Sequence, residues 1–189
     1  FSDGVFAIAI TILALELHLP DGAYHGDLGA ALLGSWPKVM SFAISFMVIA
    51  LFWRAHLRAF NWIAHADTRL ITLNLLLLML VCFLPFPTAV LGDAGSDPVA
   101  VVFYALSVAA ASLAQLLIWI YAAMGTRLIR AETPRAVRHM IAWRSLIPAA
   151  VFAASAIVAW AGYPNAAMYA WIAIVPLFWV LRTIVGREW

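Results

Sequence analysis

Six apolar stretches constrain the fold of this chain more than any other feature of its sequence. Each is long enough to form a helix that crosses about 30 Å of hydrocarbon, which takes about 20 residues. Of the 189 residues 66% are hydrophobic and only 11% are charged, which is too little charge to cover a water-soluble domain. The sequence therefore predicts an all-α membrane protein, a single domain over residues 1–189 with six transmembrane helices in a lipid bilayer. The predicted helices are Asp3–Leu19, Trp36–Ile63, Thr68–Val90, Pro98–Ile129, Pro134–Ala161 and Pro164–Val185.

Capping residues and prolines mark the boundaries of these stretches. Ser35, Asp97 and Thr133 stand just before stretches that open with a proline, in the position of a helix N-cap. Pro148 and Pro176 fall inside the fifth and sixth stretches and are expected to kink them. The second and fourth stretches exceed the thickness of a bilayer, so we expect them to project into the cytosol.

The arginines are distributed unequally between the two sets of connections. The connections around residues 54–69 and 127–144 carry several arginines, and so does the C-terminal tail. The alternate connections near residues 20–35, 91–97 and 162–165 contain neither Lys nor Arg. Because positively charged connections stay in the cytoplasm, both termini are predicted to be cytoplasmic, and an even number of helices agrees with this orientation.

The first stretch has two different faces when it is drawn as a helix. At about 100° per residue, Ile8, Ile12 and Leu15 share one stripe with Thr11 at its edge, and Asp3 projects from the opposite side. Aliphatic rings from several copies would form a constriction that gates by dewetting and favours K⁺, which sheds water more readily than Na⁺. The sequence shows no internal repeat, so a pore requires several copies around one axis. The same stripe is also typical of ordinary helix packing, and periodicity alone leaves both interpretations open.

A group of polar and amphipathic side chains is expected near the cytoplasmic face of the membrane. A carboxylate in a membrane-length helix is costly unless it is paired, so we expect Asp3 to be buried and hydrogen-bonded. The hypothesis is a polar clasp that fixes the first helix against the second and third. Asp67 also stands in the position of a helix cap, and that interpretation remains open. The polar clasp consists of Ser2, Asp3, Trp53, His56, Asp67 and Asn74.

Several classes of function lack the residues that they require. The five histidines are scattered, Cys82 is the single cysteine, and the sequence has no paired carboxylates or nucleophile motif. We therefore expect neither an enzyme nor a metal site, and no cofactor is implied. A formal charge of +2 is too small to suggest binding to nucleic acid.

Three segments resemble the transmembrane protein 175 family of lysosomal and prokaryotic potassium channels. They are Phe1-Ser2-Asp3 with the apolar helix that follows, Phe52-Trp53-Arg54-Ala55-His56, and the third stretch from Asp67 to Ala89. The resemblance implies a homotetrameric, potassium-selective channel in the plasma membrane of a prokaryote, with the first helix lining a central pore and K⁺ as the permeant ion. It also assigns the pore constriction to Ile8, Thr11, Ile12 and Leu15.

Two other functions remain as alternatives at this point. A secondary transporter would need a membrane-embedded charge or broken helices around its substrate, and the prolines inside the last two stretches are its main support. A membrane scaffold without transport activity would need no special residues. Ion flux in liposomes separates the three hypotheses, because a channel passes ions down a gradient without saturating as a carrier does.

Overall fold

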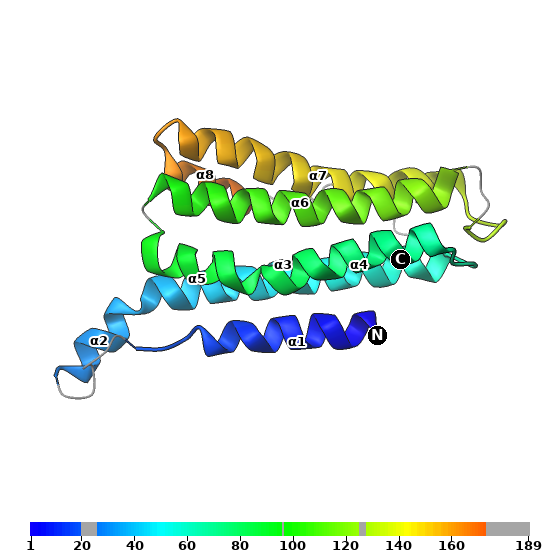
Figure 1. Ribbon diagram of the computed structural model, residues 1–189. Coiled ribbons are helices and arrows are strands. Elements are labelled where there is room, and N and C mark those ends of the chain that lie inside the picture. The colour runs from blue at the N-terminus through cyan, green and yellow to red at the C-terminus, as the bar shows by residue number, and fades with distance from the viewer. Residues whose placement is uncertain (20–25, 96, 125–127, 173–189) are drawn as a thin grey trace.

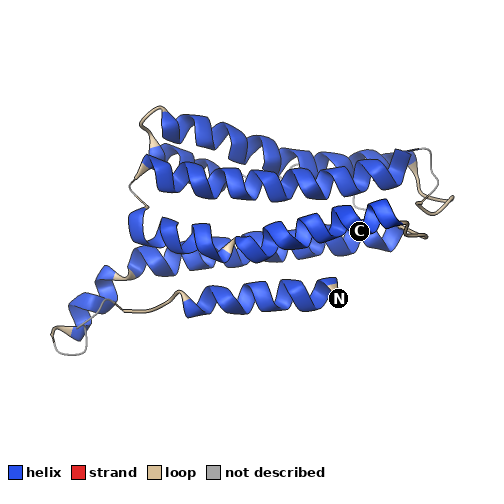
Figure 2. Ribbon diagram, in the orientation of Figure 1, coloured by secondary structure: helices blue, strands red, loops and turns tan. Residues whose placement is uncertain are grey.

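The chain folds into a bundle of helices, and the computed structural model describes residues 1–19, 26–95, 97–124 and 128–172 of it (Figure 1). Figure 2 shows helix in every element, and in these ranges the extended backbone is limited to one isolated bridge between Ile63 and Ile129. The helices are α1 (Ser2–Leu15), α2 (Leu28–Gly34), α3 (Trp36–Trp62), α4 (Thr68–Phe83), α5 (Pro85–Ala94), α6 (Pro98–Ala123), α7 (Arg135–Trp160) and α8 (Pro164–Ile172).

The helices pack in three layers. The helix α1 packs on α3, α4 and α5, which form the second layer. That layer packs on α6, and α7 and α8 complete the third layer beside α6 (Figure 1). Among the described helices, the first therefore lies at one edge of the bundle, with a neighbouring layer on one side only.

Within the described ranges, four helical segments are long and apolar enough to cross a membrane. They are α3, α4 together with α5, α6, and α7. The helix α1 is apolar but has only 14 residues, and the described part of α8 has nine. Most of the sixth predicted stretch, including Pro176, lies outside the described residues. The all-helical membrane class is confirmed, and α7 continues unbroken through Pro148.

The third predicted stretch differs from the expectation because it consists of two helices. The ladder of backbone hydrogen bonds is interrupted at Leu84, since Pro85 has no N–H to donate. Thr88 Oγ1 lies 2.8 Å from both the Leu84 carbonyl oxygen and Ser45 Oγ, and Ser45 Oγ donates to the Tyr104 hydroxyl at 3.0 Å. Ser45, Thr88 and Tyr104 are buried, so polar groups at the break bond one another across three helices.

The fourth predicted stretch is too long at its C-terminal end. The helix α6 ends at Ala123, so the expectation of helix up to Ile129 is wrong. Instead, the Ala64 N–H donates to the Leu128 carbonyl at 2.8 Å, and the Arg130 N–H donates to the Trp62 carbonyl at 2.9 Å. Backbone pairing between the two connections thus takes the place of another helical turn.

The three expected N-caps have different outcomes: Asp97 and Ser35 stand at the N-cap positions of α6 and α3, whereas the expectation for Thr133 is wrong. Asp97 accepts a backbone N–H of the first turn of α6 at 2.7 Å, as expected. Ser35 holds the N-cap position of α3, but its hydroxyl donates to the Ala31 carbonyl at 2.9 Å and does not accept a backbone N–H of α3, because the short helix α2 ends directly before α3. Thr133 donates to the Arg130 carbonyl at 2.6 Å, and α7 begins two residues later.

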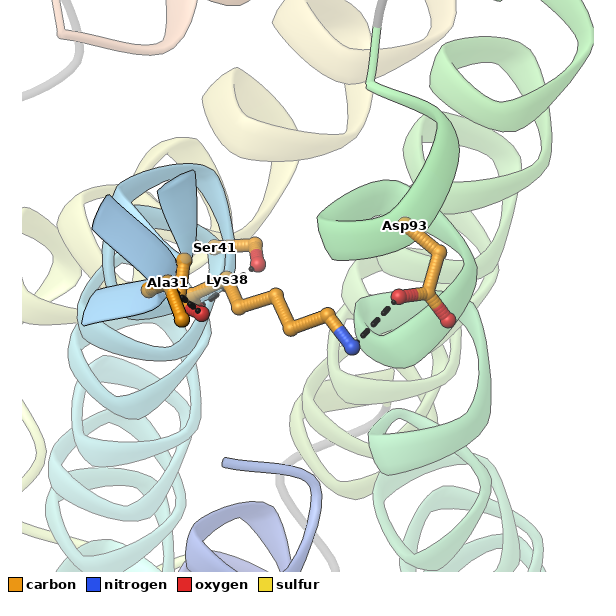
Figure 3. Close-up of polar contacts among 5 residues, drawn as sticks. Ala31, Lys38, Ser41 and Asp93 are labelled. Atoms are coloured by element: carbon orange, nitrogen blue, oxygen red, sulfur yellow. Dashed lines mark hydrogen bonds and ion pairs between the residues drawn. The ribbon is translucent and has the colours of Figure 1, made fainter. Parts of the chain in front are cut away.

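An ion pair joins α3 to α5 at the end of the bundle opposite the N-terminus. Lys38 Nζ lies 2.8 Å from a carboxylate oxygen of Asp93, and Figure 3 shows the lysine reaching across from the first turn of α3. The two helices approach closely here, since a Cβ added to Gly92 would lie 2.8 Å from Ser41 Oγ. The N-terminus and the connections after α3 and α6 lie together at the other end (Figure 1).

Candidate functional site

One face of α1 is packed against the bundle. Phe6 and Ala9 are each 1% exposed and Leu13 is fully buried. Their spacing of three and four residues places them on one side of the helix, against α3, α4 and α5. This face holds α1 in position and determines which residues are left outside the chain's own core.

The other face of α1 carries the predicted constriction residues. Ile8, Ile12 and Leu15 are 58%, 39% and 77% exposed, although all three are large and aliphatic. Thr11 is also exposed, and its hydroxyl donates to the Ile8 carbonyl at 2.8 Å, which leaves the Thr11 oxygen able to accept. The structure therefore places the four residues on one open face, directed away from the other described helices.

Three residues of the polar clasp form a hydrogen-bonded chain between three helices. Asn74 of α4 donates from Nδ2 to Ser2 Oγ of α1 at 3.2 Å. His56 of α3 donates from Nε2 to Asn74 Oδ1 at 2.8 Å. The N-terminal turn of α1 is thereby joined to α3 and α4, two of the three helices on which α1 packs.

Aromatic rings enclose the histidine of this chain. The His56 ring stacks on Phe60 with a centroid distance of 4.2 Å, and Phe6 of α1 approaches it at 5.5 Å. Only 5% of His56 is exposed, so its hydrogen bond to Asn74 is shielded from competing water. Phe60 was not expected in the site, although its position one turn after His56 is a signal that could have revealed it.

Asp3 is paired but not buried. Trp53 Nε1 donates to Asp3 Oδ1 at 2.8 Å, which joins α1 to α3 a second time. Asp3 is exposed on the surface of the single chain, so the expectation that the fold of one chain would bury it is wrong. The reason is geometric, because Asp3 projects from the border between the packed and open faces of α1, and the indole reaches out to it.

Asp67 makes hydrogen bonds within α4 and to α6. One carboxylate oxygen accepts the Leu70 N–H at 2.9 Å and so caps α4. The other accepts the Tyr121 hydroxyl of α6 at 2.6 Å. The structure thus gives Asp67 the capping position, and it adds a contact to the third layer that no pattern in the sequence predicts.

Taken together, this geometry describes a helix that is fixed at its N-terminal end and open along one side. The contacts of Ser2 and Asp3 hold the first turn on α3 and α4, and Phe6 packs just below them. The open side offers aliphatic side chains and one hydroxyl, and such groups can line a narrow path but cannot carry out acid–base chemistry. A bundle of this kind defines a polytopic α-helical membrane protein.

Comparison with known proteins places the chain within this class. The sequence model of a family described as endosomal/lysosomal potassium channel TMEM175 matches residues 1–85. The chain is 42% identical over 124 residues to a protein from Streptomyces collinus and 40% identical over 140 residues to one from Chamaesiphon minutus, both named as potassium channels. The matches cover 63% and 71% of this chain but only 60% and 69% of the two relatives. The chain belongs to the TMEM175 family.

A solved structure extends the similarity to the last helices. It is the crystal structure of a homologue of the lysosomal potassium-selective channel TMEM175 from Chamaesiphon minutus, with a TM-score of 0.83 and 30% sequence identity. The similarity covers 95% of this chain and 93% of that one. The resemblance found in the first ninety residues is confirmed, and the fold of α6 and α7 belongs to it as well.

Proposed function

We propose that the chain is one subunit of a potassium-selective channel, a homotetramer in which α1 from each copy lines a central pore. Each subunit crosses the membrane six times in this proposal, because α1 and the sixth predicted stretch, Pro164–Val185, are added to the four long segments. The relatives named as potassium channels and the similar solved structure support the function. The protein would then conduct K⁺ as the permeant ion. This proposal involves neither a cofactor nor an enzymatic reaction.

The observation that carries the proposal is the open aliphatic face of α1. Ile8, Ile12 and Leu15 are exposed on a helix whose opposite face is packed, at the edge of the bundle. Four such faces around an axis would form stacked apolar rings, with the hydroxyl of Thr11 between them. An ion crossing these rings loses part of its hydration shell, and K⁺ loses it at lower cost than Na⁺.

The polar clasp has a positioning role in this proposal. The hydrogen bonds of Ser2, Asp3, Trp53, His56 and Asn74 hold the cytoplasmic end of α1 on α3 and α4. The packed face of this 14-residue helix leaves its N-terminal turn to the polar contacts, so the width of the constriction depends on how firmly that end is held. Asp67 supports the same end indirectly by capping α4.

The distribution of arginines supports an orientation with both termini in the cytoplasm. The connections around residues 54–69 and 127–144 contain the arginines, and the described parts of both lie at the same end as the N-terminus (Figure 1). Such a positive end faces the cytoplasm in bacterial membranes. The proposal therefore places the channel in the plasma membrane of a prokaryote.

A secondary transporter is less well supported than a channel. The break between α4 and α5 resembles the broken helices of transporters, but its polar groups bond one another and are buried. A transport site would instead present unpaired groups to a cavity. No observation favours a scaffold without transport activity over a channel.

Potassium flux in liposomes tests the proposed function. Purified protein should pass K⁺ faster than Na⁺ down a gradient, and planar bilayers should show single-channel steps at the same protein density. Flux that saturates with K⁺ concentration in the absence of single-channel steps would indicate a carrier. Liposomes that remain impermeable to both ions, with the protein correctly assembled, would leave only the scaffold.

A further inference from the structure

Three arginines gather where α3 approaches α7. Arg54 and Arg58 are one turn apart on α3 and therefore project from the same side. The charge of Arg58 is close enough to interact electrostatically with both Arg54 and Arg144 of α7, and α3 packs directly against α7. Arg58 and Arg144 are half-buried and Arg54 is exposed. The cluster is thus partly enclosed by two helices and open on its outer side.

The two arginines that α3 contributes to this cluster carry positive charges that no described ion pair neutralises. Arg54 and Arg58 form no ion pair with any residue in the described ranges, and the described ion pair Lys38–Asp93 lies at the opposite end of the bundle. Guanidinium groups remain protonated at any ordinary pH, so their mutual repulsion cannot be relieved by losing a proton. An anion with several oxygens, such as a phosphate, would offset this repulsion and accept bidentate hydrogen bonds.

An apolar strip continues from the cluster toward the middle of the membrane. Met47 and Leu51 precede Arg54 by seven and three residues, so they lie on the same face of α3. They are 57% and 36% exposed. Trp143, next to Arg144 on α7, is also exposed, as is typical of tryptophan at a membrane interface. Basic groups above an apolar strip match the two parts of a phospholipid.

We propose that Arg54 and Arg58, where α3 packs against α7, bind the phosphate headgroup of an anionic phospholipid of the cytoplasmic leaflet, whose acyl chains lie along Met47 and Leu51. The assignment to the cytoplasmic leaflet rests on the orientation given under the proposed function. A phospholipid fits better than free phosphate because the apolar strip begins directly beside the basic groups. Basic sites between transmembrane helices on the cytoplasmic side are suited to anionic headgroups in general.

Native mass spectrometry of the purified protein tests this site. Dioleoyl phosphatidylglycerol is the anionic probe, and dioleoyl phosphatidylcholine, which has no net charge, is the comparison. We expect the parent protein to bind phosphatidylglycerol in preference to phosphatidylcholine. The double variant Arg54→Gln with Arg58→Gln should weaken phosphatidylglycerol binding about thirtyfold, because each removed charge contributes about fivefold near an anionic surface. The matched control is Arg135→Gln, an exposed arginine at the start of α7, which should leave binding unchanged.

Three results would overturn the lipid site. The first is equal binding of phosphatidylglycerol by the double variant and the parent. The second is displacement of bound lipid by excess inorganic phosphate, which would show a site for free phosphate. The third is dissociation of the assembly in the double variant alone, which would show a contact between copies. If the double variant does not fold, Arg54→Gln alone must weaken binding about fivefold. Lipid binding is measured without ion flux, so failure of this site and failure of the channel are distinguishable.

Discussion

The two faces of α1 consist of similar residues but lie in opposite environments. Phe6 and Leu13 are covered by three neighbouring helices, whereas Ile8 and Leu15 are 58% and 77% exposed. Hydrophobicity cannot distinguish the two faces, because all of these side chains are apolar and can be buried either in lipid or in a protein core. The polar contacts of the first turn and the buried side chains of the packed face together fix the rotation of the helix, and this rotation determines which face is open. The packed face therefore stabilises α1 within the subunit, whereas the open face remains exposed on the single chain.

Loss of the packed face should give the largest effect. Phe6→Ala would remove a fully packed ring that contacts His56, and cavities of this size typically cost about 3 kcal/mol or more. We expect a lower melting temperature and less assembled protein in size-exclusion chromatography. Ile8→Ala on the open face is the control and should leave assembly intact. Equal loss of stability in the two variants would show that α1 is not packed as described.

A change on the open face should alter conduction while the protein still assembles. Ile8→Asn would replace one apolar ring with amide groups that restore part of the lost hydration, so we expect higher conductance or a roughly several-fold lower preference for K⁺ over Na⁺. Leu15→Ala should act in the same direction by widening the path. Ile71→Asn on α4 is the matched control, because Ile71 is 51% exposed and belongs to another helix. Single-channel recordings in which Ile8→Asn and Ile71→Asn behave alike would contradict the assignment.

Removal of a polar contact should have a smaller effect on stability. Asp3→Ala would remove the acceptor for Trp53 Nε1, a loss of about 1 kcal/mol that should destabilise assembly or change gating. Asp27→Ala is the control, since Asp27 is exposed and caps only the short helix α2. Thermal unfolding and liposome flux measure the two variants side by side. If both changes are tolerated equally, the polar clasp does not position α1.

The smallest effect is expected deep in the bundle, away from both faces of α1. Tyr104→Phe would remove the hydroxyl that accepts from Ser45, at a cost of about 0.6 kcal/mol, because the remaining hydroxyls can bond one another. Tyr163→Phe, at an exposed position, should cost nothing. Conduction should be unchanged in both variants. Altered selectivity in Tyr104→Phe would mean that the structure at the break between α4 and α5 influences the ion path.

Hydropathy predicted the long helices well but failed where backbone geometry determines the structure. The bounds of α3 and α7 follow the apolar stretches within one or two residues. The break at Leu84 arises from the missing N–H of Pro85, which a hydropathy average does not register. Leu128 and Ile129 are apolar, yet they pair with the connection after α3 instead of extending α6.

The candidate site was predictable where it depends on the periodicity of one helix. Spacing alone places Ile8, Ile12 and Leu15 on one stripe, and the structure leaves that stripe exposed. Contacts between helices were harder to predict from the sequence, because they depend on the rotation and depth of each helix. The contact between Asp67 and Tyr121 joins residues 54 positions apart, and no local pattern marks Tyr121 as a partner.

Cysteine accessibility in reconstituted channels tests the central claim that the open face of α1 lines the ion path. Cys82 is exposed, so it is first replaced in a Cys82→Ala background. Ile12→Cys is then compared with Ile71→Cys, which lies on an exposed face of α4. We predict that aqueous Cd²⁺ blocks K⁺ current through the Ile12→Cys channel and leaves the Ile71→Cys channel unaffected. Unchanged current through an assembled Ile12→Cys channel, or equal block of both variants, would contradict the account.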